Sequence, residues 1–98
     1  MDTYFLKNNI NSFIKIGRSS NVSQRVKGLT RQLQFVDITL LLTIEGDYES
    51  LLHDHFKEKR VYGEWFDIEF NKEDILSIVE NLKPSSNNTS NNTSDDNI

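Results

Sequence analysis

The chain has 98 residues, a formal net charge of −4 and no cysteine, so its length suits one small domain and its composition excludes disulfides and thiolate metal sites. Its longest apolar run, ITLLLTI, is far shorter than the roughly 20 residues that a membrane-spanning helix needs. Met1 and Asp2 are not followed by the basic segment and long apolar segment of a signal peptide. We therefore expect an intracellular protein, cytoplasmic or nuclear, that is not secreted and has no membrane partner.

The N-terminal segment predicts a β-hairpin. TYFLKN, residues 3 to 8, is typical of a strand, NINS of a turn, and FIKIG, residues 13 to 17, of a second strand. Because side chains alternate along a strand, Ile14 and Ile16 share one face, which we assign to the core. Lys15 and Gly17 then share the other face.

A helix is predicted next, over residues 22 to 33. Asn21 and Gln24 resemble a capping pair, and apolar residues recur at helical spacing at Val22, Val26, Leu29 and Leu33. Gly28 costs about 1 kcal/mol relative to alanine inside a helix, which hints at close packing there.

Residues 37 to 45 predict a third strand, and their continuous apolar character suggests burial on both faces in the middle of a sheet. Asp47 is a plausible N-cap for a helix over residues 48 to 59. Its expected apolar stripe consists of Tyr48, Leu51, Leu52 and either His55 or Phe56.

RVYG is expected to break that helix and EWFDI to form a short extended piece. Asn71 can cap a last helix, with Ile75, Leu76, Val79 and Leu82 facing inward. Residues 1 to 83 then form the domain, and residues 84 to 98, which repeat NNTS, form a disordered tail rich in Asn, Ser and Thr. The order of elements predicts an α+β fold in which helices cover a small antiparallel sheet.

The charges divide unevenly along the chain. Residues 1 to 36 hold six cations against one acid, a net charge of +5, whereas residues 37 to 83 carry −7. This asymmetry suggests a basic face for an anionic partner, and the alternative is simply solvated faces. The Asn-rich and Ile-rich composition is also compatible with an AT-rich genome such as that of a virus or phage.

Three residues could form a pocket suited to phosphate. Tyr4 and Lys15 lie on neighbouring strands, and Arg25, in the first turns of the helix, could lean over the same edge. The structural alternatives are a packed tyrosine, a solvent-facing lysine and an arginine whose stem covers apolar surface.

Glu49, His53 and Phe56 follow the i, i+4, i+7 spacing, so they share one edge of their helix. A glutamate in a cleft is a normal anchor for Mg²⁺, whereas His53 can instead be a packed or hydrogen-bonded histidine. His53 and His55 do not face each other on a helix, which argues against a shared zinc ion. Trp65 is expected to be a core aromatic; the alternative is an exposed ring that stacks on a base.

These residues together resemble the GIY-YIG nuclease superfamily. The resemblance rests on the order of Tyr4, KIG, Arg25 and a helix glutamate. Three motifs are more narrowly similar to the T5orf172 or Mug113 branch of the superfamily, namely KIGRSSN, ExxxLHxxF and GEWF, and the resemblance covers residues 3 to 68. The resemblance implies a three-stranded antiparallel sheet flanked by helices. It also implies an endonuclease that hydrolyses DNA by one-step attack of activated water with one Mg²⁺ or Mn²⁺ ion.

The resemblance also implies roles for single residues. Tyr4 is the candidate base, Gly17 the motif glycine, Arg25 the phosphate-stabilising arginine and Glu49 the metal ligand, and His53 belongs to the branch motif. Lys15 replaces a tyrosine and could hold Tyr4 as phenolate, bind the phosphate or protonate the leaving oxygen. The alternative function is a nucleic-acid-binding module on the same fold that does not cut, in which Arg18, Arg25 and Lys27 hold phosphates, and a third possibility is a protein-interaction domain tethered by the NNTS tail. The predicted substrate-binding residues are Arg18, Lys27 and Gly17.

Overall fold

The fold is α+β, as predicted, but its antiparallel sheet has five strands rather than three, in the order β3-β1-β2-β5-β4. The computed structural model describes residues 1–32 and 37–83. Its elements are β1 (Asp2–Asn8), β2 (Ile14–Ser19), α1 (Val22–Gln32), β3 (Ile38–Glu45), α2 (Glu49–His55), the 3₁₀ helix η1 (Lys57–Lys59), β4 (Arg60–Tyr62), β5 (Trp65–Phe66) and α3 (Lys72–Leu82).

The two additional strands form a short hairpin. Tyr62 pairs with Trp65 across a two-residue turn, in which Gly63 has a φ of 53°. Only glycine adopts this backbone readily. RVYG lies outside the helix, as expected, but the sequence analysis did not assign RVY to a strand, and RVY pairs with β5.

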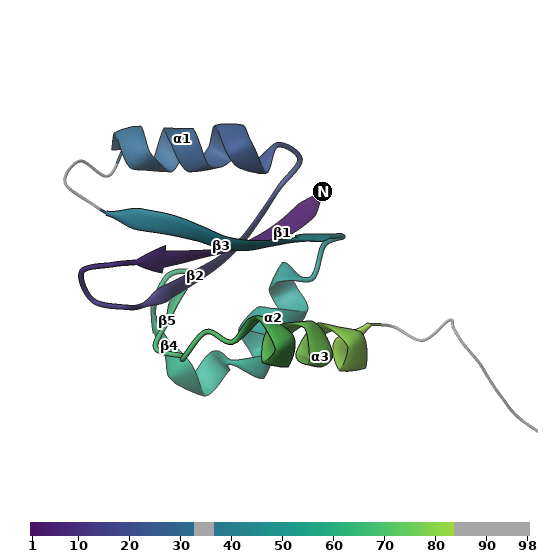
Figure 1. Ribbon diagram of the computed structural model, residues 1–98. Helices are drawn as coiled ribbons and strands as arrows, with labels where there is room; N and C mark the ends of the chain where they lie inside the picture. Colours follow the sequence, from purple (N-terminus) through teal and green to yellow (C-terminus); the bar gives the residue numbers. More distant parts are fainter. Residues whose placement is uncertain (33–36, 84–98) are drawn as a thin grey trace, which may run out of the picture.

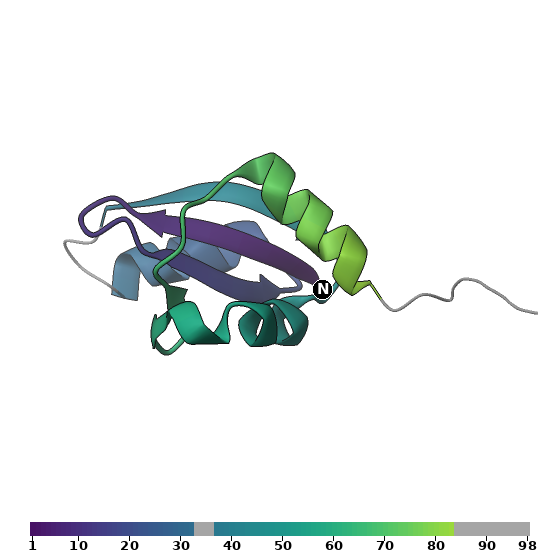
Figure 2. The ribbon, with the colours of Figure 1, turned by 90° about the horizontal axis from the view of Figure 1, so that it is seen from below.

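Helices cover both faces of the sheet (Figure 1). α1 lies over one face, where Leu29 packs on Tyr4 and Leu6 of β1. α2 and α3 both lie over the other face, which Figure 2 shows from that side. The main core is between these two helices and the sheet, and consists of Phe5, Ile14, Ile16, Leu52, Phe66, Ile75 and Val79. The predicted inward orientation of Ile14 and Ile16 is confirmed.

The prediction that the third strand lies in the middle of the sheet was wrong. β3 is an edge strand, paired only with β1, and none of its residues is fully buried. A β-bulge explains its apolar run: Phe5 pairs with Leu42 and Leu6 with Leu40, so Leu41 is the extra residue. Leu41 and Leu42 both pack against the main core, while Leu40 is exposed.

The N-terminal caps predicted for the helices are present, with one exception. Asn21 accepts a hydrogen bond from the Gln24 amide and Asn71 accepts one from the Asp74 amide, as predicted. Asp47 does not cap α2. The buried Thr3 hydroxyl accepts a hydrogen bond from the Tyr48 amide at 2.8 Å and donates one to the Gly46 carbonyl at 2.7 Å.

Three further expectations about the helices fail. α2 ends at His55 and η1 follows it, so the predicted helix over residues 48 to 59 was too long. Leu51 and Leu76 are exposed rather than inward, since Leu52 and Ile75 take the buried positions of their helices. A Cβ atom at Gly28 would meet no atom within 4 Å, so close packing does not explain this glycine.

Leu33 and residues 84 to 98 lie outside the described residues, so the predicted end of α1 and the predicted tail are not described. Among the described residues, no helix has the length and apolar character that a membrane crossing requires.

Candidate functional site

Tyr4 is held in the sheet by the absence of a side chain at Gly17. The two residues are opposite each other in the β1–β2 register, so they share one sheet face. A Cβ atom at Gly17 would lie 2.5 Å from Cζ of Tyr4, well inside van der Waals contact. The tyrosine ring therefore lies across the glycine, with only 1% of the residue exposed.

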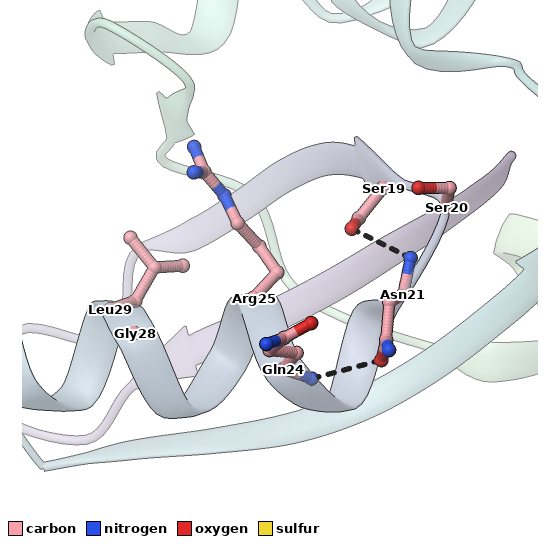
Figure 3. Close-up of a pocket in the computed structure, with 7 residues that line it drawn as sticks. All are labelled: Ser19, Ser20, Asn21, Gln24, Arg25, Gly28 and Leu29. Atoms are coloured by element: carbon pink, nitrogen blue, oxygen red, sulfur yellow. Dashed lines mark hydrogen bonds between the residues drawn. The ribbon is translucent and has the colours of Figure 1, made fainter.

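Arg25 comes to the same face from α1. Its side chain projects from the helix on the same side as Leu29 (Figure 3). The interaction of its guanidinium with the Tyr4 hydroxyl raises the pKa of Arg25, so the cation beside the phenol is permanent. Tyr4 and Arg25 thus lie close enough to interact, and their roles in catalysis stay predictions.

Lys15 is buried and has one carboxylate partner. Its Nζ atom lies 2.6 Å from Oε1 of Glu64 and 5.8 Å from the centre of the Trp65 ring. A buried ammonium group needs such a partner, because desolvation otherwise favours its neutral form. Lys15 is therefore no solvent-facing spacer, and Trp65 is a core aromatic, as predicted, rather than an exposed stacking ring.

Glu64 reaches Lys15 because β5 covers only part of β2. The two strands pair at Ile14 and Lys15, and the Ile16 amide donates a further hydrogen bond of 3.0 Å to the Glu64 carbonyl. Beyond Ile16 no strand of the described residues covers this edge of β2. Glu64 lies at the point where the edge of β2 is no longer paired, between the sheet face that α1 covers and the face that α2 covers.

Glu49 lies on the α2 side of the same edge, in the first turn of that helix. Burial raises the pKa of Glu49, and the negative charge of Glu64 raises it further. Arg18 opposes this effect: its Nε atom is 3.7 Å from Oε1 of Glu49, and its Nη1 atom is 2.6 Å from Oδ2 of Asp47. Arg18, predicted to bind substrate, thus already has two acidic neighbours.

Both ring nitrogens of His53 have polar neighbours. Nε2 lies 2.8 Å from the Ile16 carbonyl oxygen, and because a carbonyl only accepts, Nε2 carries the proton. Nδ1 lies 3.3 Å from Nη2 of Arg60, and the ring packs against Phe66. These contacts attach α2 to the open edge of β2 and support the hydrogen-bonded alternative. A catalytic role for His53 stays a prediction.

The edge thus brings together most of the residues predicted from the sequence: Tyr4, Lys15, Gly17, Arg18, Arg25, Glu49 and His53. Lys27 lies apart from them, exposed on α1. The sequence reasoning missed Glu64, Asp47 and Arg60. Only Glu64 had a usable signal, because a buried Lys15 demands a carboxylate and GEWF supplies one beside two core aromatics.

Two carboxylates at this edge could hold a magnesium ion, which stays a prediction. Among residues 1–32 and 37–83 there is no cluster of three or more histidine, cysteine or acidic side chains. Glu49 and Glu64 are nevertheless close enough to raise the pKa of Glu49 through their interaction. One or two carboxylates suit Mg²⁺, which keeps several of its waters, and do not suit zinc.

The comparison with family models gave a match that spans most of the chain. The T5orf172 domain matches residues 3–83, which takes in the strands and helices of the described structure except Asp2, the first residue of β1. Neither curated proteins nor solved structures gave a significant match. Because the matched region covers well over half of the sequence, the chain belongs to the T5orf172 domain family.

Proposed function

We propose that this protein is a GIY-YIG-like endonuclease that hydrolyses DNA phosphodiester bonds with the help of one Mg²⁺ or Mn²⁺ ion. One observation carries the proposal: the open edge of β2 gathers a phenol with a cation beside it, a buried lysine and two neighbouring carboxylates. This set contains a proton acceptor, positive charge for a phosphate and oxygen ligands for a metal.

Each residue has a role in the proposed reaction. A water molecule attacks phosphorus and passes its proton to Tyr4, which reacts as the phenolate and becomes the phenol, while the bond from phosphorus to the leaving oxygen breaks. Arg25 stabilises the negative charge that builds on the phosphate oxygens. Lys15, which Glu64 keeps in place, protonates the leaving oxygen.

Glu49 and Glu64 would hold the metal ion. When bound, the ion supplies Lewis-acid polarisation of a phosphate oxygen. Because the pKa of Glu49 is raised, a cation bound beside it would lower this pKa by favouring the ionised carboxylate.

The test is cleavage of supercoiled plasmid and of branched DNA with Mg²⁺ or Mn²⁺. We expect nicked or cut products with the wild-type protein, none with Glu49→Ala, and wild-type activity with Glu58→Ala, a matched change at an exposed glutamate. DNA that stays intact with the wild-type protein in both metals would exclude the nuclease.

A second candidate function is a DNA-binding module that does not cut. It is favoured by the burial of Tyr4 and by the Lys15–Glu64 ion pair, which together leave little of the phenol or the ammonium open to solvent. This function predicts steeply salt-dependent DNA binding that neither Mg²⁺ nor Glu49→Ala changes.

A further inference from the structure

A hollow of about 330 Å³ opens beside Arg25. Figure 3 shows it between the turn at Ser19 and Ser20 and the side of α1 that carries Arg25 and Leu29. Its walls are mostly polar, and the Asn21 cap at the start of α1 belongs to them. The hollow thus starts at the candidate catalytic arginine and continues along the helix.

A second hollow, of about 560 Å³, adjoins the first. Asn21, Gln24 and Gly28 line both hollows. The second hollow adds two cations, Lys27 and Arg31. The two hollows therefore form one depressed surface along α1, with cations at both ends.

Gly28 lies where the two hollows meet. It follows Arg25 by three residues and precedes Arg31 by three, so it is the helix neighbour of both cations. A Cβ atom there would meet no atom of the protein within 4 Å. Glycine weakens a helix interior, and here no internal contact requires it. The missing side chain instead lowers the surface between Arg25 and Arg31.

The charges of α1 fit an anionic chain. The helix holds Arg25, Lys27 and Arg31 and no acidic residue. Within the part of the chain that the structure describes, none of the three forms a salt bridge with a carboxylate. Arg18, by contrast, is paired with Asp47.

From these observations we propose that α1 carries the sugar-phosphate backbone of one DNA strand, which crosses the helix at Gly28 and reaches the candidate active site at Arg25. This inference rests on the proposed function and adds the path by which the substrate enters. The six residue steps from Arg25 to Arg31 rise about 9 Å along the helix axis. A strand with one charge per roughly 3.4 Å would place about two to three phosphates beside the three cations.

The experiment compares Gly28→Leu with Thr30→Leu, an exposed position of the same helix that lines neither hollow. Binding of fluorescein-labelled 20-mers, single-stranded and duplex, is measured by anisotropy in EDTA, where no metal-dependent cleavage interferes. We expect Gly28→Leu to weaken binding by at least about fivefold and Thr30→Leu by less than about twofold. An effect on one substrate alone identifies whether the strand is single or part of a duplex.

Lys27→Ala and Arg31→Ala provide a second measurement that does not depend on the leucine. Each should reduce the slope of log Kd against log salt concentration by about 1. Equal binding by Gly28→Leu and Thr30→Leu, or unchanged salt slopes, would overturn the proposed path. Because this assay measures binding, it can succeed where the cleavage assay fails, and it can fail while cleavage is observed, so the two proposals are separable.

Discussion

Replacing Gly17 by alanine should destabilise the protein by displacing Tyr4. The added Cβ atom would lie 2.5 Å from both Cζ and Oη of the tyrosine and 3.0 Å from Cε2. Contacts this short do not persist, so the ring has to move. Because only 1% of Tyr4 is exposed, it can move only by disturbing Leu6 and Leu29, which pack around it.

Such overpacking typically costs about 1 to 3 kcal/mol. For a domain of this size, each kcal/mol lowers Tm by about 4 to 8 °C, so thermal unfolding followed by circular dichroism resolves the effect easily. Gly28→Ala is the matched control, because the same methyl group there meets open space in a helix. It should stabilise the protein by up to about 1 kcal/mol.

A double-mutant cycle separates the clash from any general intolerance of alanine at Gly17. In a Tyr4→Leu background the ring is gone, so Gly17→Ala should cost less than in the wild type. Tyr4→Phe should give no such relief, because Cζ remains in place. A Gly17→Ala variant with the wild-type Tm would refute the register and the packing on which the candidate site is built.

Three further predictions concern polar contacts around the edge of β2. Glu64→Gln should cost about 1 to 2 kcal/mol in urea denaturation, since the partly exposed partner of the buried Lys15 is lost, and adding Lys15→Met should recover stability. Thr3→Val should lower the free energy of unfolding in urea by about 1 to 3 kcal/mol, because the Tyr48 amide and the Gly46 carbonyl lose their partner; an unchanged midpoint would contradict this. In EDTA, Glu49→Gln should raise Tm relative to the wild type by an amount that grows from pH 4 to 7. The raised pKa of Glu49 in the folded state favours its acid form, so the wild-type glutamate stabilises the fold below the unfolded pKa and loses that contribution as pH rises. A Tm difference that is independent of pH would contradict this.

The parts of the fold that depend on local signals could be predicted from the sequence. The alternation around Lys15 indicates which side of β2 faces the main core, and the Asn21 and Asn71 caps need only the following turn of helix. The position of β3 could not be predicted, because an apolar edge strand with a bulge at Leu41 has the same continuous run as a central strand.

The residues of the candidate site also divide into those that local sequence could predict and those that it could not. The meeting of Tyr4, Gly17 and Lys15 follows from one hairpin, and α1 starts soon after it, so Arg25 has little freedom. Glu64 is 49 residues from Lys15 in the sequence, and only the pairing of a two-residue strand brings them together. No local pattern encodes such a contact, although the requirement of a buried lysine for a carboxylate does limit the choice.

The separation of charge along the chain becomes a separation in space. Acids from the second half of the chain neutralise cations that face the α2 side and the sheet edge, namely Arg18 through Asp47 and Lys15 through Glu64. The cations of α1 lie on the opposite face, which none of the other helices of the described residues covers (Figure 1).

An acidic protein can therefore still attract a polyanion, provided that the polyanion approaches from the α1 side. Such an approach brings phosphates to Arg25 before they meet the carboxylates of Glu49 and Glu64, whose mutual repulsion a divalent cation relieves. On the proposed function, we therefore expect Mg²⁺ to strengthen DNA binding at this edge, because each ligand offsets a charge that repels the other.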